Sequence, residues 1–523
     1  MDHHKENHEV LRGASVVGLF ILGSRLLGYV RDAVLAYFFG ARDLMDIFVV
    51  AFRIPNTFRR LFGEGSLTIA FVPVFTERLK NQSKEDAKEL ADTLGTVLCL
   101  VLTLLSILGV IFAPLVVWVF AGGFTADPQK FHMAIQATRI VFPYILLISL
   151  VAWAMGILNS LKHFSAPAAA GMVLNVAIIL GVIFLPAITG IDRLYCACLA
   201  ILIGGVLQLL LQFPFLKALG FFPRVRFNFK NEGFKKVLHL MGPAIFGSAV
   251  YQLNILIMTR FASNLPEGSN SFLYYADRIF QLPLGLFGIS VATSALPALS
   301  RLASDRNKEG FAQTFSFSMR AILFIVLPAM AGLLALRIGI VQTLFQSGQF
   351  TWDHTQETAK ALAWFSLGLA SVALVRVTVA GFNAFQNTKT PVQVAVIALI
   401  SNVVFSYFLM KSFGHQGLAL AVTLSSTVNF VLLAFILSRR YGPLGGRSVL
   451  RAAIRLSLLA LVMGLLVFCL SQMVVWEEGG RSLIKITIIF GLIIFGMGFY
   501  LLGAKILGFP EFQEFFKPKN PSV

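Results

Sequence analysis

The sequence contains few cysteines, few charged residues and no long hydrophilic stretch. Only 13% of its 523 residues are charged, and no polar segment is long enough to fold as a separate domain. The four cysteines lie in apolar runs and the eight histidines are scattered without metal-ligand spacing, so we expect no metal site. A GxxxxGK[ST] phosphate loop is also missing. We therefore expect neither an enzyme nor a nucleotide-driven pump within this chain, and no cofactor.

Apolar residues are abundant and occur in runs of membrane-spanning length. They make up 57% of the chain, and the mean hydropathy is +0.80. One run of roughly 20 apolar residues follows another, which is typical of an all-α integral membrane protein. We predict fourteen transmembrane helices near 14–39, 46–75, 91–120, 132–160, 166–188, 193–218, 236–263, 270–300, 314–345, 356–385, 391–411, 415–438, 450–473 and 482–507.

The distribution of basic residues predicts how the chain is oriented. Loops after even-numbered spans hold most of the Lys and Arg residues, whereas loops after odd-numbered spans hold few. By the positive-inside rule both termini are cytoplasmic, with tails at 1–13 and 511–523. The net charge of +18 then reflects orientation and attraction to anionic membrane lipids, and nucleic acid is not an expected partner.

The chain also repeats itself at an offset of about 224 residues. This shift aligns Gly18 with Gly242 and Pro73 with Pro297, and NSLKHFSAP with NAFQNTKTP. We predict two pseudo-symmetric six-helix lobes, at 14–220 and 221–445, plus two C-terminal helices at 446–510. The alternative is that Pro and Asn recur only because they favour helix ends.

Charged residues inside the second span predict a polar pathway. An arginine at mid-membrane costs about 2.5–3.5 kcal/mol on insertion scales, so it needs water, a counter-charge or a polar substrate nearby. Asp46, Arg53 and Arg60 recur every seven residues and form one stripe on a helix, with Asn56 and Glu64 beside them. The stripe is typical of a cavity wall. The alternative is a set of ion pairs that join helices.

Other spans add further intramembrane charges. The first carries Arg25, Arg31 and Asp32, and the eighth carries Asp277 and Arg278. Basic groups outnumber acidic ones, which predicts an anionic guest, and the planar guanidinium suits phosphate. Arg260 and Arg376 lie in the seventh and tenth spans. For Arg260, an equal alternative is that its side chain extends (snorkels) to the lipid headgroups.

Helix-breaking residues occur in the same charged spans. A proline or glycine inside a span frees backbone groups that a cavity or a neighbouring helix must satisfy, and such places bend. Bent helices between two rigid lobes predict transport by alternating access. The candidate hinge residues are Gly28, Pro55, Gly63, Gly65, Pro283 and Gly285.

Several motifs together resemble the MurJ (MviN) family of bacterial lipid II flippases, in the multidrug/oligosaccharidyl-lipid/polysaccharide exporter superfamily. They are SRLLGYVRD at 24–32, FRIPNTFRRLFGEG at 52–65, YYADR at 274–278 and KTPV at 389–392. The resemblance implies that Arg31, Arg59 and Arg278 lie in a central cavity. It also implies that Arg25, Asp46 and Glu64 are functionally sensitive, and that the last two helices form a groove for a polyprenyl tail. This chain departs from some members at Gln281, where they carry a glutamate.

The resulting hypothesis is a flippase for lipid II, the undecaprenyl-diphosphate-linked disaccharide-pentapeptide, in the bacterial inner membrane. We expect transport to be driven by the membrane potential or by coupling to a monovalent cation. The candidate partners are membrane lipids and other cell-wall synthesis proteins. Two alternatives stay open: an exporter of another polyprenyl-linked glycan, and a drug/cation antiporter of the same superfamily. The substrate-binding candidates are Arg25, Arg31, Arg53, Arg59, Arg60 and Arg278, and the coupling or orienting candidates are Asp32, Asp46, Glu64, Asp277 and Gln281.

Overall fold

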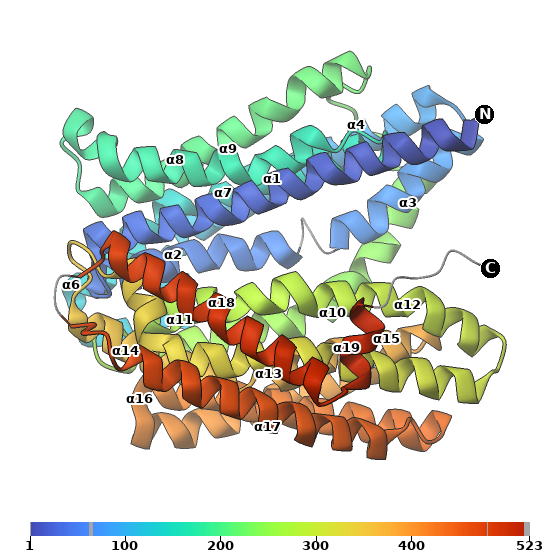
Figure 1. Ribbon diagram of the computed structural model, residues 1–523. Coiled ribbons are helices and arrows are strands. Elements are labelled where there is room, and N and C mark those ends of the chain that lie inside the picture. The colour runs from blue at the N-terminus through green and yellow to red at the C-terminus, as the bar shows by residue number, and fades with distance from the viewer. Residues whose placement is uncertain (1, 62–65, 478–479, 517–523) are drawn as a thin grey trace. The chain divides into compact units, whose positions relative to one another are not determined.

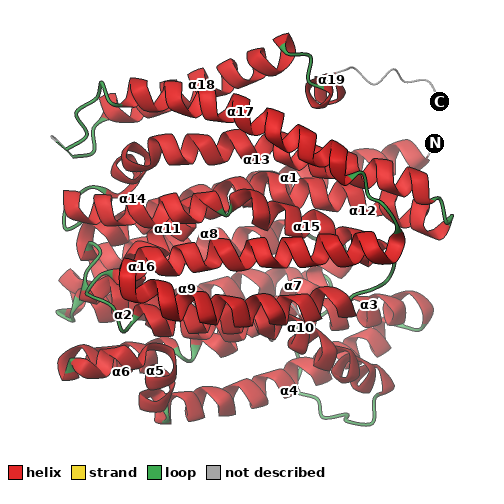
Figure 2. Cartoon of the chain, turned by 90° about the horizontal axis from the view of Figure 1, so that it is seen from below, coloured by secondary structure: helices red, strands yellow, loops and turns green. Residues whose placement is uncertain are grey.

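The computed structural model describes residues 2–61, 66–477 and 480–516. The described residues are helices joined by loops, without a strand (Figure 2). Contacts divide the chain into two compact units, Met1–Gly268 and Ser269–Val523. The lobe limits of 14–220 and 221–445 remain a prediction. α10 (Glu232–Ala262) falls within the second predicted lobe, but it packs on α3 (Ser66–Asn81) and belongs to the first compact unit.

The first unit is built from ten α-helices within the described residues. α8 packs against α9, and α1 also packs along α8 (Figure 1). Besides α3 and α10, the helices are α1 (Asp2–Phe39), α2 (Asp43–Phe58), α4 (Lys84–Ile111), α5 (Ala113–Ala121), α6 (Pro128–Val141), α7 (Tyr144–Ser160), α8 (Ser165–Thr189) and α9 (Arg193–Ala218), with a 3₁₀ turn at Gly122–Ala126.

The second unit centres on α13, which packs against α12, α14, α15, α17 and α18. The helix α16 contains a kink at Gly414, where φ is 55°, so it consists of the two segments predicted at 391–411 and 415–438. The helices are α11 (Ser269–Pro283), α12 (Ile289–Ser304), α13 (Lys308–Phe345), α14 (Trp352–Leu367), α15 (Leu369–Ala384), α16 (Lys389–Tyr441), α17 (Gly446–Ser471), α18 (Leu483–Ile506) and α19 (Pro510–Phe516), with a π-helical turn at Leu284–Gly288.

Several helix boundaries recur at the predicted offset of about 224 residues. The starts of α4 and α13, Lys84 and Lys308, are 224 residues apart. Left-handed glycines at Gly190 and Gly414, also 224 apart, end corresponding segments. The matching positions extend from Lys84 to Gly190, which favours an internal repeat over helix-end chemistry alone. The same offset relates the starts Pro128 and Trp352, the starts Ser165 and Lys389, and the ends Ser160 and Ala384.

The membrane-protein class is confirmed, and the number of crossings stays a prediction. Ten helical stretches of the described residues are long and apolar enough to cross a bilayer. Each of the fourteen predicted spans overlaps a helix or two consecutive helices, but not all of these reach that length. The ends of the chain differ from prediction: α1 begins at Asp2 and α19 covers 510–516, so both predicted tails are partly helical.

Candidate functional site

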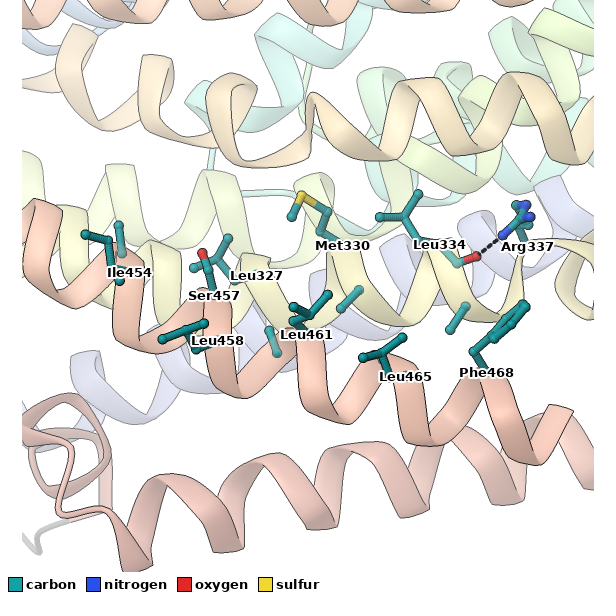
Figure 3. Close-up of a pocket in the computed structure, with 15 residues that line it drawn as sticks. Leu327, Met330, Leu334, Arg337, Ile454, Ser457, Leu458, Leu461, Leu465 and Phe468 are labelled. Atoms are coloured by element: carbon teal, nitrogen blue, oxygen red, sulfur yellow. Dashed lines mark hydrogen bonds between the residues drawn. The ribbon is translucent and has the colours of Figure 1, made fainter.

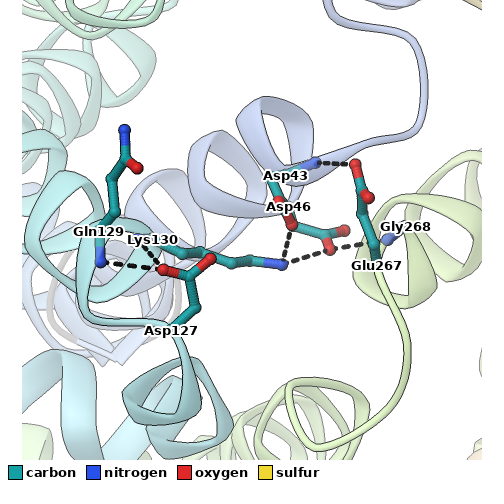
Figure 4. A network of polar contacts seen from close by, with 7 residues as sticks. All are labelled: Asp43, Asp46, Asp127, Gln129, Lys130, Glu267 and Gly268. Carbon is teal, nitrogen blue, oxygen red and sulfur yellow. Dashed lines mark hydrogen bonds and ion pairs between the residues drawn. The ribbon is translucent and has the colours of Figure 1, made fainter.

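A network of charged groups joins α2 to α6 in the first unit (Figure 4). Asp46, whose exposed fraction is 2%, accepts a hydrogen bond of 2.9 Å from the backbone N–H of Gly268. It also pairs with the Lys130 ammonium at 3.2 Å, and Lys130 forms a second ion pair with Asp43. A buried carboxylate needs such partners, because an unpaired charge in low dielectric is strongly unfavourable. The network therefore fixes Asp46 in place.

Local helix chemistry places Lys130 in this network. Asp127 caps α6 by accepting hydrogen bonds from the N–H groups of Gln129 and Lys130, at 2.9 and 3.1 Å, and Pro128 occupies the first helical position. Lys130 lies 4.4 Å from the ring centre of Phe124, within cation–π range. The ammonium is thus held beside the aromatic ring with its donors directed at the two aspartates.

A second buried cluster joins α1 to α8. Arg31 and Asp32 are only 5% and 1% exposed, and their closest ion-pair distance is 2.7 Å. A further guanidinium N–H of Arg31 donates to the side-chain oxygen of Asn175 at 3.0 Å. Asn175 in turn donates to the backbone oxygen of Ser24 at 3.0 Å. These bonds link two helices, as in the ion-pair alternative, whereas Arg25 on the same helix is exposed.

The arginines of α2 lie toward its C-terminal end. Arg53 donates to the buried hydroxyl of Thr259 on α10 at 2.8 Å. Pro55 is buried inside α2, and the helix passes into a π-helical turn that contains half-buried Arg59 and Arg60. Three predicted site residues, Glu64 and the candidate hinges Gly63 and Gly65, lie outside the described residues.

The eighth predicted span, in the second unit, also passes from a helix that contains a proline into a π-helical turn, as α2 does. α11 ends at Pro283, a π-helical turn that includes Gly285 follows, and α12 begins. Arg278 donates to the Tyr274 hydroxyl at 3.1 Å and lies over the Tyr274 ring at 5.0 Å. Near the end of α11, the side-chain amide of Gln281 donates a hydrogen bond to the carboxylate of Asp277. Gly28, by contrast, lies inside continuous α1.

An apolar groove lies between α13 and α17 in the second unit (Figure 3). Its volume is about 620 Å³. Gly464 allows α17 to approach closely, since a Cβ there would lie 3.1 Å from that of Ala331. The groove involves the first of the two C-terminal helices that the resemblance assigns to a lipid tail. Its lining includes Leu327, Leu334, Ile454, Leu461, Leu465 and Phe468.

The structure brings together predicted residues with partners that sequence reasoning missed. Asp46 meets Lys130, Arg31 meets Asn175, and Arg53 meets Thr259. Lys130 lies between two predicted spans and is not among the candidate site residues of the sequence analysis. Its position in the first turn after a capping aspartate is a local signal, but no local signal connects it to Asp46, 84 residues earlier in the chain.

Comparison with solved structures identifies the fold. A structure described as the inward-facing conformation of a multidrug resistance MATE family transporter of the MOP superfamily matches with a TM-score of 0.66. The match covers 80% of this chain and 94% of that one, at 16% identity. At that identity the likeness shows the fold alone, a bundle of helices arranged as in that structure.

The chain belongs to the lipid II flippase MurJ family, whose model matches residues 35–487. The lipid II flippase MurJ of Burkholderia cenocepacia is 37% identical over 88% of this chain and 90% of its own. The probable lipid II flippase MurJ of Vibrio cholerae is 36% identical over 95% and 96%. A solved lipid II flippase MurJ in an inward closed conformation matches with a TM-score of 0.76 at 27% identity, covering 94% of this chain and 99% of that one.

Proposed function

We propose that this protein carries lipid II from the inner to the outer leaflet of the bacterial cytoplasmic membrane. Membership of the lipid II flippase MurJ family over residues 35–487 carries the proposal. The transport-class fold and the apolar helices support it. Both termini lie in the cytoplasm, as the distribution of basic loops predicts, and other cell-wall synthesis proteins are candidate partners.

The diphosphate is bound by arginine side chains while the sugar and peptide occupy aqueous space. Arg31 directs donors to Asp32 and Asn175, so its main role is to join helices. Arg59 and Arg278 are half-buried, and we assign the diphosphate to them. Arg25, Arg53 and Arg60 are secondary ligands. A planar guanidinium can donate two parallel hydrogen bonds to a phosphate, which supports this assignment.

Alternating access requires contacts that break and reform at each end of the pathway. The links of Lys130 and Gly268 to Asp46 lie at the end of α2 that the charge pattern predicts to be outside. We assign them the role of an outer latch that must open before the headgroup leaves. The π-helical turns after α2 and α11 are the corresponding bending points.

The membrane potential is the proposed drive. An inside-negative potential assists an anion moving outward by about 2.3 kcal/mol per charge per 100 mV, and the diphosphate supplies the charge. Collapse of the potential in reconstituted vesicles, with ion gradients retained, should slow transport. An unchanged rate would reject this drive and favour coupling to a monovalent cation.

Charge-removing variants test the assignment of the arginines. Arg59→Ala and Arg278→Ala should each abolish complementation in a depleted bacterial host at normal membrane levels. Arg439→Ala is the matched control, because Arg439 is an exposed basic residue at the end of α16 and should remain active. If the first two variants fail to accumulate in the membrane, these arginines stabilise the fold and the assignment is wrong.

A further inference from the structure

The groove between α13 and α17 has one charged end. Fifteen residues line it, and Arg337 is the sole ionisable residue among them. Leu327 and Ile454 lie toward one end, and Arg337 lies at the other beside Phe468 (Figure 3). Leu327 and Arg337 are ten residues apart on α13, so the charge is displaced by about 15 Å along the helix.

Arg337 does not snorkel toward the nearer end of its helix. α13 ends at Phe345, eight residues later, and the snorkelling side chain of a membrane helix would extend that way. Instead, the guanidinium donates to the backbone oxygen of Leu334 at 2.6 Å, one turn toward the N-terminus. Side chains on a helix naturally lean in that direction. The guanidinium is therefore held beside the groove and directed away from the nearer end of the helix.

The guanidinium has donors left for a ligand. Across residues 2–61, 66–477 and 480–516, no ion pair includes Arg337, and its one recorded hydrogen bond is the bond to Leu334. A guanidinium carries five N–H donors, and an arginine in an apolar setting requires an anionic or strongly accepting partner. The ligand chemistry that fits is a phosphate attached to a long apolar chain.

We propose that Arg337 binds the phosphate end of the polyprenyl diphosphate lipid and fixes the direction in which its tail lies in the groove. The inference rests on the proposed function for the identity of the lipid. A single apolar lane between two helices fits the one tail of a polyprenyl lipid better than the paired tails of a phospholipid. The charge pattern predicts that the Arg337 end faces outward. The site therefore receives the lipid in the outer leaflet, after headgroup transfer.

Site-specific photocross-linking of the full-length protein tests this directly. A photoreactive amino acid replaces Leu461, which lines the groove, and the probe is radiolabelled undecaprenyl diphosphate in phosphatidylethanolamine vesicles. Arg337→Gln should lower cross-linking by about tenfold, because a charge-assisted hydrogen bond is lost. Arg337→Lys should retain most of it. Undecaprenol, which has no phosphate, should cross-link weakly and equally in all three proteins.

Controls separate the inference from its alternatives. A photoreactive residue at Val462, which is exposed on α17 and is not among the groove-lining residues, should report only background lipid contact. Equal cross-linking of Arg337→Gln and the parent would overturn the inference, as would full competition by phosphatidylglycerol. Lipid II transport is measured on the same vesicles. If transport is intact while Arg337→Gln has no effect, this inference fails alone; if the parent binds the probe without transporting lipid II, the proposed function fails.

Discussion

The two units of the chain use intramembrane charge in different ways. In the first unit, Arg31 pairs with Asp32, and Asp46 pairs with Lys130, so buried cations and carboxylates stabilise each other between helices. In the second unit, the groove on α13 and α17 holds one guanidinium, Arg337, among apolar side chains. The clusters around these two ion pairs of the first unit therefore join helices, whereas the charge in the groove remains available to a ligand.

The largest effect is expected at the Arg31 cluster. Arg31→Met leaves Asp32 buried without its guanidinium and should lower the free energy of unfolding by about 3–5 kcal/mol. Unfolding of the purified protein in detergent measures this. The double variant Arg31→Met, Asp32→Leu should recover most of the loss, because neither charge remains. A stable Arg31→Met protein that has lost transport would instead place Arg31 among the substrate ligands and remove the contrast between the units.

The Asp46 network should show strong coupling. Asp46→Asn and Lys130→Met remove the two sides of one ion pair, and a double-variant cycle should give a coupling energy of about 2 kcal/mol. Chemical unfolding of the two single variants and the double variant provides the cycle. If the losses in the two single variants simply add up in the double variant, the coupling energy is zero and this buried ion pair does not stabilise the first unit.

Filling the groove should impair function without loss of stability. Ala335 lines the groove, and Ala335→Trp should slow lipid II transport by about tenfold, equivalent to about 1.4 kcal/mol of lost lipid binding. The melting temperature should not fall. Val462→Trp, on the exposed face of α17, is the size-matched control and should transport normally. Equal rates for all three proteins would show that the groove is not used.

The smallest effect is expected at the link between α2 and α10. Thr259→Val removes the acceptor for Arg53 and should lower the free energy of unfolding by about 1 kcal/mol. Thr259→Ser keeps the hydroxyl and should retain most of the stability. An unchanged free energy of unfolding in Thr259→Val would show that the hydrogen bond from Arg53 does not stabilise the contact between α2 and α10.

Much of the fold could be predicted because its determinants are local or periodic. Runs of apolar residues predicted the helices, and the predicted offset of about 224 residues recurs in helix boundaries such as Lys84 and Lys308. The helix breaks were also visible in sequence, since Pro283 directly precedes a π-helical turn. The helices and their breaks depend on composition within one helix length, and the repeat depends on a constant offset along the chain.

The partners of the charged residues could not be predicted, because they come from distant parts of the chain. Arg31 and Asn175 are 144 positions apart, and Arg53 and Thr259 are 206 apart. Sequence alone could not distinguish a cavity-lining arginine from one that joins helices. Arg337 was overlooked because it is a single charge in a long apolar run, without a stripe of polar neighbours.

The most direct test of the proposed function is transfer of lipid II by the purified protein in vesicles. Fluorescent lipid II is placed in one leaflet under an imposed potential, and its appearance in the other leaflet is followed with a membrane-impermeant quencher. We predict rapid transfer by the parent protein and background transfer by Arg59→Ala and Arg278→Ala proteins of normal stability. Background transfer by the parent under every imposed potential, with the protein folded, would contradict the proposal.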